Sequence, residues 1–349
     1  MKMKIKRTLS IGTAMGATML SLTLVPYAAS ASVRPATTVD ASLAQPHWVI
    51  HGTIGPYSDA FWTTMACGGM QEAKTLGVSL TWYSDTAAIG AAQIAERVQA
   101  AGLGNPNGII LTPQGAINNN PYLAAWAKKH IPVIETNDVV GSPFYQIIES
   151  KEDNPAVVAM ADVIAKQTGG TGTVGILVVE PGIPQVVYRY KPLISELHRV
   201  APNLNVLGIQ YDQGSVSVSE TIAAAEIVAH PDMKAIYATS GQEVVGAATA
   251  VKAAGKAGKI GVYGYDAEPN EVALLKQGLV FGLIAQSPYL VGALSVQHLV
   301  TLLNSRITNP NAPVGQGTPF DYYTPTKILT PANINTPAAA HFVYSTSCS

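Results

Sequence analysis

Short apolar runs rich in β-branched residues alternate with longer segments of helical periodicity from His47 onward. This alternation predicts parallel β-sheets with helices on both faces, which is the α/β class. The expected strands are more numerous than one mononucleotide-binding unit requires. They are His47–Thr53, Val78–Trp82, Asn107–Thr112, Ile131–Thr136, Thr173–Val179, Leu204–Gln210, Lys234–Thr239, Lys259–Tyr265 and Val280–Ala285.

The first long helical segment, about residues 61–76, has apolar or small residues at three- and four-residue spacing. These residues are Trp62, Met65, Ala66, Gly69, Ala73 and Leu76. A stripe of this kind is expected to face the sheet. Cys67 lies off the stripe, on a flank that a returning C-terminal segment could reach.

The strand–helix series is interrupted near residues 141–154, and the chain is long enough for two lobes. The predicted segments are residues 47–151 plus 287–319 for a first lobe, residues 152–286 plus 320–330 for a second lobe, and residues 331–349 for a C-terminal tail. A last helix is expected over Pro288–Leu303. The remainder is rich in Pro, Asn and Thr, so it cannot continue that helix.

Residues 1–31 have the features of a secretory signal peptide. Four basic residues precede an apolar stretch from Leu9 to Val25, and Ala29-Ser30-Ala31 is a small-residue cleavage site. Ser and Thr interrupt the stretch and Pro26 follows it, so a retained transmembrane helix is the weaker alternative. No cysteine lies near the cleavage site, so we expect an extracytoplasmic protein, periplasmic or secreted, without a lipid anchor.

The composition is that of an ordered globular protein, with 12% charged and 48% hydrophobic residues. Cleavage after residue 31 removes four of the 21 Lys and Arg residues and none of the 22 Asp and Glu residues, leaving a formal charge of −5. An acidic chain without clustered Lys and Arg disfavours nucleic acid and anionic membranes as partners.

The sequence contains two cysteines, Cys67 and Cys348. In an oxidising compartment they could form one long-range disulfide or stay as two unpaired thiols, and the sequence leaves both open. The cysteines and the seven histidines lack metal-ligand spacing. Gly169-Gly170-Thr171-Gly172 precedes a strand and does not follow one, so neither a metal site nor a nucleotide cofactor is expected.

Polar residues follow several of the predicted strands. Asn137 and Asp138 follow the fourth strand, Ser240 the seventh, Asp266 the eighth and Gln286 the ninth. Ligands of open α/β sheets bind beyond the carboxyl ends of the strands, because loops and helix N-termini converge there. These residues are therefore candidate ligand contacts.

A sugar or polyol is the ligand that these residue types favour. Each hydroxyl donates and accepts, and a carboxylate, side-chain amide or guanidinium can bond two hydroxyls at once. The polar candidates are Asp266, Gln286, Asn137 and Arg189, and the aromatic candidates for the apolar sugar faces are Tyr57, Phe61 and Trp62. The alternatives are that Phe61 and Trp62 are core residues and that Asp266 caps the following helix.

Several motifs occur in the order and spacing of a known family. They are AFW at 60–62, GMQEAKTLGV at 69–78, NGIILTP at 107–113, IPVI at 131–134, HPDMKAIYA at 230–238, YGYD at 263–266 and IAQ at 284–286. From Trp48 to Asn333 the chain resembles the ribose-binding type of periplasmic sugar-binding proteins. The resemblance implies the type I periplasmic binding protein fold, in which a multi-strand hinge joins two Rossmann-like lobes with parallel sheets.

The resemblance also implies roles for individual residues. In the family, the aromatics matching Phe61 and Trp62 sandwich the sugar ring, and the residue matching Asp59 bonds a hydroxyl. The other matching contacts are Asn137, Arg189, Ser240, Asp266 and Gln286. The family has Asp-Arg after the fourth strand and Asn-Asp after the seventh, where this chain has Asn137-Asp138 and Ser240-Gly241. A ligand other than ribose is therefore expected.

The function implied by the resemblance is capture of the ligand between the lobes and delivery to an ABC permease, by a monomer that shifts from an open to a closed form. Hinge segments are expected near residues 137–153, 266–288 and 318–328. A ligand-sensing protein that presents a sugar-like signal to a membrane receptor is the alternative, and the sequence does not separate the two.

Two other classes are disfavoured by the sequence. An enzyme, for example a glycosidase using two of Asp212, Asp266 and Glu268, would need a recognisable acid and nucleophile pair, and none is present. A repressor of this fold would carry a helix-turn-helix ahead of the core, where this chain has the predicted signal peptide.

Overall fold

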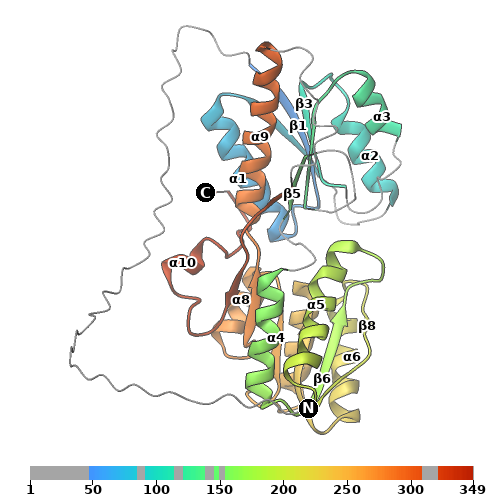
Figure 1. Ribbon diagram of the computed structural model, residues 1–349, viewed down its shortest axis with the longest axis vertical. Coiled ribbons are helices and arrows are strands. Elements are labelled where there is room, and N and C mark those ends of the chain that lie inside the picture. Colours follow the sequence, from blue (N-terminus) through green and yellow to red (C-terminus); the bar gives the residue numbers. More distant parts are fainter. Residues whose placement is uncertain are drawn as a thin grey trace, which may run out of the picture. The chain divides into compact units, whose positions relative to one another are not determined.

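The computed structural model describes residues 47–84, 91–113, 121–137, 145–148, 154–308 and 321–348. The predicted signal peptide and Asp138 lie outside the described residues. Two β-sheets with helices around them account for most of the described chain (Figure 1).

The first sheet is entirely parallel within the described residues and has the strand order β12-β5-β4-β3-β1-β2. Its strands are β1 (Val49–Ile54), β2 (Ser79–Ser84), β3 (Gly108–Leu111), β4 (Val133–Thr136), β5 (Tyr145–Ile148) and β12 (Asp321–Tyr323). β3 and β4 are buried along their whole length. Burial on both faces explains the continuous apolar run of β3, whereas β4 also buries the polar residues Glu135 and Thr136.

The second sheet has the order β13-β11-β10-β9-β6-β7, with β8 also paired to β6. Its strands are β6 (Gly172–Val178), β7 (Leu204–Val206), β8 (Gln210–Tyr211), β9 (Met233–Ala238), β10 (Gly261–Tyr265), β11 (Gly282–Ala285) and β13 (Lys327–Leu329). β13 runs antiparallel to β11, and the other pairs are parallel. The predicted strand Leu204–Gln210 is therefore two short strands, because residues between Val206 and Gln210 leave the ladder.

Helices α1 to α9 each lie between two strands in the chain, as the alternating pattern requires, and α10 follows the last strand. They are α1 (Ala60–Leu76), α2 (Ala91–Ala101), α3 (Pro121–Lys128), α4 (Pro155–Thr168), α5 (Pro184–Val200), α6 (Val216–Ala229), α7 (Gly241–Ala253), α8 (Pro269–Lys276), α9 (Pro288–Thr308) and α10 (Pro337–Ala340). None of the helices in the described ranges has the length and apolar character to cross a membrane.

Helix α1 begins and ends at recognisable capping residues. The Asp59 carboxylate accepts a hydrogen bond from the N–H of Phe61, and Gly77 closes the helix in the left-handed conformation at φ 67°. The predicted apolar stripe is buried except for Leu76, which is exposed because it lies in the last turn.

Helix α9 follows β11 of the second sheet, returns to the first sheet and lies beside α1 (Figure 1). Two glycines allow the close approach. A Cβ on Gly68 would lie 1.9 Å from the carbonyl oxygen of Tyr289, and a Cβ on Gly292 would lie 1.9 Å from that of Met65. The first lobe, meaning the first sheet with α1, α2, α3 and α9, is therefore built from separated parts of the chain.

The chain also crosses from the first sheet to the second between β12 and β13. The predicted segmentation placed residues 320–330 in the second lobe, but β12 pairs with β5 of the first sheet while β13 pairs with β11 of the second. The division is wrong at this point because Thr324–Thr326, which belongs to neither strand, forms the crossing. The second lobe, meaning the second sheet with α4 to α8, thus contains β13 but not β12 of the predicted segment 320–330.

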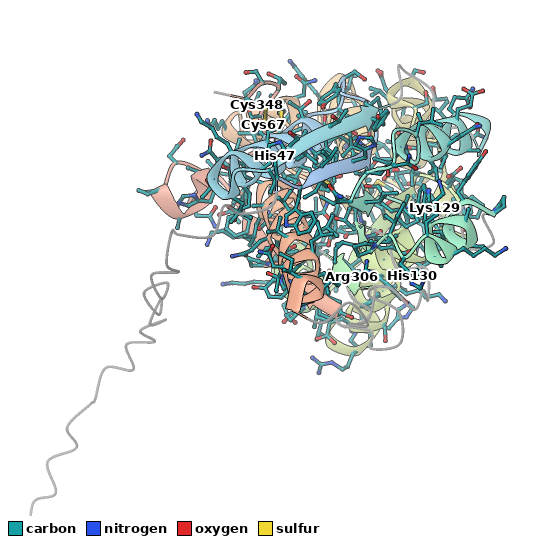
Figure 2. The ribbon with its side chains drawn as sticks, turned by 90° about the horizontal axis from the view of Figure 1, so that it is seen from above. His47, Cys67, Lys129, His130, Arg306 and Cys348 are labelled. Atoms are coloured by element: carbon teal, nitrogen blue, oxygen red, sulfur yellow. A yellow bond between two sulfur atoms is a disulfide. The ribbon has the colours of Figure 1, made fainter. Side chains whose placement is uncertain are left out.

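The C-terminal tail folds back onto α1. Cys67 and Cys348 form a disulfide bond, with their Cα atoms 5.2 Å apart, and Figure 2 shows the two residues side by side. The sequence left open whether the two cysteines form a disulfide or stay as unpaired thiols, and in the structure they form the disulfide. Cys67 lies on the flank of α1, where the tail reaches it.

Candidate ligand-binding cavity

A cavity of about 620 Å³ is lined by residues of both lobes. The lining residues are Pro56, Ser58, Asp59, Phe61, Trp62, Asn137, Val179, Glu180, Ile183, Gln185, Val186, Arg189, Gln213, Gly214, Ser240, Gln242, Asp266, Glu268 and Gln286. Most of them follow the carboxyl end of a strand or begin the next helix, which is the expected position for a site in parallel sheets.

The first turn of α1 supplies the aromatic part of the lining. Phe61 and Trp62 are each only 6% exposed and also belong to the hydrophobic core, so the core and cavity interpretations both hold for them. Gly55 leaves the space that the indole of Trp62 occupies, because a Cβ there would lie 2.3 Å from its Nε1. The sequence between β1 and α1 thus fixes where the aromatic surface lies.

The two aromatic rings form one wall and not the two sides of a sandwich. Their centroids are 4.9 Å apart and their planes meet at 86°, so no sugar ring fits between them. This differs from the role that the resemblance implied for the pair. The apolar residues that the second lobe contributes to the lining are Val179, Ile183 and Val186, which are aliphatic.

Asp266 is the centre of a polar group at the end of β10. Its Oδ1 accepts a hydrogen bond from Gln286 Nε2 at 2.5 Å and another from the hydroxyl of Tyr344 at 3.2 Å. Its Oδ2 lies 3.6 Å from a guanidinium nitrogen of Arg189. This carboxylate therefore connects α5, β11 and the C-terminal tail.

Arg189 is held in place by three groups of the second lobe. One guanidinium nitrogen donates to the carbonyl oxygen of Thr239 at 2.9 Å, and the guanidinium lies over the ring of Tyr265, 4.3 Å from its centroid. The Tyr237 hydroxyl donates to the Arg189 carbonyl oxygen. The side chain is therefore oriented before a ligand arrives, which lowers the entropic cost of binding.

Ser240 is positioned by a buried carboxyl group. Oε2 of Glu243 accepts hydrogen bonds from the backbone N–H groups of Thr239, at 2.6 Å, and Ser240, at 2.9 Å. These bonds fix the turn from β9 into α7, where Ser240 lines the cavity.

Three lining residues other than glycine have positive φ angles. They are Asn137 at 66°, Gln213 at 59° and Asp266 at 81°. Residues with side chains adopt this region rarely, Asn and Asp more readily than Gln. Such strain concentrates at functional sites, where the surrounding structure holds the backbone in place.

Two carboxyl groups of the lining have raised pKa values. Burial and then the charge of Asp266 raise the pKa of Asp59 to about 6, although hydrogen bonds from backbone N–H groups oppose the shift. Burial and then the charge of Asp59 raise the pKa of Glu268 to about 8. At neutral pH Asp59 is therefore an acceptor, while Glu268 keeps a proton that it can donate.

The structure brings the described candidates together. Asp59, Phe61, Trp62, Asn137, Arg189, Ser240, Asp266 and Gln286 all line the cavity, while Asp138 lies outside the described residues. Tyr57 is 46% exposed and does not line the cavity. The alternative that Asp266 caps the following helix is wrong, because Glu268 is the N-cap residue of α8.

Several polar lining residues were not among the candidate ligand contacts, and Glu180, Gln213 and Gln185 show why. Glu180 lies two residues after the end of β6 and would have been found by reading every strand end. Gln213 follows β8, which the sequence had merged with β7. Gln185 is a buried residue in the first turn of α5, where no local pattern distinguishes it.

Of the three carboxyl groups considered for hydrolysis, Asp266 and Glu268 line the cavity. Asp212, one of the carboxyls considered for hydrolysis, does not line the cavity and instead accepts a hydrogen bond from Ser219. No group of three or more His, Cys, Asp or Glu residues that could hold a metal ion occurs in the described ranges.

Two lobes with parallel sheets that share one polar cavity define a solute-binding protein. The chain belongs to the family described as periplasmic binding protein domain, which it matches over residues 53–307. This confirms the prediction of the type I periplasmic binding protein fold and of a binding protein rather than an enzyme.

Curated relatives have names that fit this family. The chain is 26% identical over 254 residues to the D-allose-binding periplasmic protein of Escherichia coli, covering 70% of this chain and 80% of the relative. It is 27% identical over 266 residues to the ribose import binding protein RbsB of Haemophilus influenzae, covering 75% of this chain and 87% of the relative.

Solved structures share the fold. An ABC transporter solute-binding protein from Agrobacterium vitis, bound with α-D-tagatopyranose, has a TM-score of 0.74 and 23% identity. The similarity covers 85% of this chain and 99% of that chain.

Proposed function

We propose that the protein binds a neutral monosaccharide or polyol in the cavity between its lobes and delivers it to an ABC permease. The observation that carries the proposal is the composition of the lining. An aromatic wall from the first lobe accompanies a fixed carboxylate, guanidinium and amide from the second lobe, which is the set that a polyhydroxylated ring requires.

An unsatisfied acceptor supports a ligand with hydroxyl groups. Oε1 of Gln286 is buried and has no hydrogen-bond partner within the described residues. A buried polar atom without a partner costs free energy, and a hydroxyl donated by a ligand would remove that cost. The Nε2 atom of the same amide is already bonded to Asp266, so the amide is held with Oε1 free to accept.

The charges of the lining favour a neutral ligand over an anionic one. Among the described lining residues the acidic ones are Asp59, Glu180, Asp266 and Glu268, and the basic one is Arg189. Arg189 is already paired with Asp266. A phosphate or carboxylate on the ligand would therefore lie among acids without a free basic partner, which is unfavourable in a cavity of low dielectric constant.

The relatives support transport as the purpose of binding. Their names include a D-allose-binding periplasmic protein and a ribose import binding protein, and sugar-bound ABC transporter solute-binding proteins share the fold. We infer that this chain acts outside the cytoplasmic membrane as a monomer. The permease recognises the ligand-bound form, whose population the sugar increases by contacting both lobes.

Thermal-shift titration of the purified mature protein tests the proposal. D-ribose, D-allose, D-tagatose and a set of alditols form one arm, and the matching sugar phosphates and uronic acids form the control arm. A ligand that binds only the folded state raises the melting temperature by mass action. We expect one or more neutral compounds to raise the melting temperature, and shifts confined to the sugar phosphates and uronic acids would contradict the proposal.

A further inference from the structure

Tyr344 lies behind the polar side of the cavity without lining it. The residue is 3% exposed, and its hydroxyl oxygen accepts a hydrogen bond from the backbone N–H of Gln286 at 3.1 Å. The same hydroxyl donates to Oδ1 of Asp266 at 3.2 Å. Because the side-chain amide of Gln286 also donates to that oxygen, the three residues close a ring of hydrogen bonds.

The ring of hydrogen bonds holds the two residues that face the ligand. Asp266 has a positive φ angle, so its backbone does not settle by itself in the conformation that aims the carboxylate. The Tyr344 hydroxyl links this carboxylate to the backbone N–H of Gln286, directly after β11, through one hydrogen bond to each. Groups that orient a binding residue in this way determine how well the residue is preorganised.

Residues 344–348, which we call the C-terminal clasp, contact both lobes. The N–H of Tyr344 donates to the carbonyl oxygen of Ala267 in the second lobe. The N–H of Ser345 donates to Oγ1 of Thr64 on α1 at 2.7 Å, and the Tyr344 ring lies edge-on to that of Phe61 with centroids 5.7 Å apart.

The disulfide fastens the clasp to the same helix that carries the aromatic wall. Cys348 bonds to Cys67, six residues along α1 from Phe61. Chain termini are poorly ordered unless they are tied down, and this bond ties down the segment that ends with the clasp. Its removal would let Tyr344 leave its position more often.

We propose that Tyr344 is a positioning residue for ligand binding, which holds Asp266 and Gln286 in their binding geometry, and that the Cys67–Cys348 disulfide keeps it there. This inference rests on the proposed function, because it assigns a role within the same cavity. It extends the site to a segment that touches no ligand.

The Tyr344→Phe variant tests the inference, since it removes the hydroxyl and keeps the packed ring. Tyr263→Phe is the matched control, because Tyr263 is a fully buried tyrosine of the second lobe whose hydroxyl has no partner within the described residues. Isothermal titration uses whichever of D-ribose, D-allose and D-tagatose binds the unmodified protein. We expect Tyr344→Phe to weaken binding about tenfold, the effect of one hydrogen bond to a charged group, and Tyr263→Phe to change it less than twofold.

A double-mutant cycle separates positioning from a general structural role. If Tyr344 acts through Asp266, the Tyr344→Phe change should weaken binding less than twofold in the Asp266→Ala background, which lacks the oxygen that accepts from the Tyr344 hydroxyl. A full tenfold loss in that background, or no loss in the otherwise unmodified protein, would overturn the inference. The paired Cys67→Ala and Cys348→Ala changes should weaken binding severalfold, and unchanged affinity would overturn the role of the disulfide.

Crystal structures of the ligand-free protein and of Tyr344→Phe provide a test that needs no sugar. We expect the Asp266 carboxylate and the Gln286 amide to adopt new side-chain conformations in the variant. Identical conformations would overturn the inference even if no sugar binds. Absence of binding by the unmodified protein to every sugar tested would instead count against the proposed function.

Discussion

At the scale of single residues, Asp266 has more hydrogen-bond and ion-pair partners than its position after a strand indicates. One side chain accepts from Gln286 and Tyr344 and pairs with Arg189, so the three elements around it share one carboxylate. A buried group with several partners is costly to alter, because each partner is then left without its own bond.

The Asp266→Asn variant should bind the sugar at least tenfold more weakly, or about 1.4 kcal/mol. Asn keeps the size of the side chain and tolerates the positive φ angle, but it removes the charge that Arg189 faces. Isothermal titration measures the affinity. Asp232→Asn is the control, because Asp232 hydrogen-bonds Thr173 away from the cavity, and equal losses in the two variants would contradict a role for Asp266 in binding.

Trp62 combines two roles, so its removal should affect both binding and folding. We expect Trp62→Ala to weaken sugar binding by about 1–3 kcal/mol through the lost ring surface. Because the side chain is buried in the core, the same change should lower the free energy of unfolding by about 3–5 kcal/mol. Titration and urea denaturation measure the two effects, and a variant of unchanged stability would show that Trp62 is not a core residue.

At the scale of elements, the strands were the most predictable part of the fold. Continuous apolar runs such as Ile109–Leu111 are required wherever a parallel strand is covered on both faces, so the pattern marks them directly. Polar residues at the strand ends, such as Ser240 and Gln286, could also be predicted to meet, because all strands of a parallel sheet end at one edge.

Features that depend on distant parts of the chain could not be predicted. The hydrogen bonds of Tyr344 join positions 58 and 78 residues apart, and no local pattern encodes them. The angle between the rings of Phe61 and Trp62 depends on side-chain packing around α1, which strand and helix periodicity do not specify. The assignment of β12 failed for the same reason, since a three-residue strand has too short a pattern to indicate its partner.

Buried carboxyl groups at the starts of α7 and α8 should make stability depend on pH. Burial and then the charge of Asp212 raise the pKa of Glu243 to about 8, and burial and then the charge of Asp59 raise that of Glu268 to about 8. Burial and then the charge of Asp266 raise the pKa of Glu271 as well. The folded state therefore holds protons that the unfolded state releases at lower pH.

The free energy of unfolding should consequently fall as the pH rises from about 5 to about 8. Glu243→Gln keeps an acceptor for Thr239 and Ser240 but cannot ionise. The difference in melting temperature between this variant and the unmodified protein should therefore be a few degrees more favourable to the variant at pH 8 than at pH 5. Melting curves between pH 5 and 9 measure the slope. Glu96→Gln is the control, because Glu96 is an exposed residue of α2, and an equal slope in both variants and the unmodified protein would refute the assignment.

The contact between α1 and α9 should not tolerate a side chain at Gly292. A Cβ there would overlap the Met65 carbonyl oxygen, which cannot move without shifting the helix. We expect Gly292→Ala to cost about 1–3 kcal/mol of stability, measured by urea denaturation. Gly208→Ala is the control, because a Cβ there would meet nothing within 4 Å, and a similar loss in both would mean that the helices are less close than described.

On the scale of the whole molecule, the binding residues are distributed so that neither lobe holds the complete set. Phe61 and Trp62 belong to the first lobe, whereas Arg189, Asp266 and Gln286 follow or lie within elements of the second. The ligand therefore favours the arrangement of the lobes in which the residues of both lobes contact it at once. A substitution in either lobe should consequently change the affinity for the ligand.

The disulfide makes a simple prediction about the intact protein. No free thiol should react with a thiol reagent in denaturant before reduction, and two should react afterwards. Reagent titration in guanidinium chloride, with and without a phosphine reductant, gives the count. Two reactive thiols before reduction would show that the cysteines are unpaired.

The return of α9 to α1 also has a consequence for the order of folding. Strands β6 to β11 of the second sheet follow one another along the chain, whereas the first sheet needs α9 and β12 from beyond them. Contacts between distant residues form more slowly than contacts within a continuous stretch, because more chain entropy is lost when they close. The second lobe can thus fold while the first still waits for its final helix, and an early intermediate would protect amide hydrogens of β9 and β10 before those of β1 and β3.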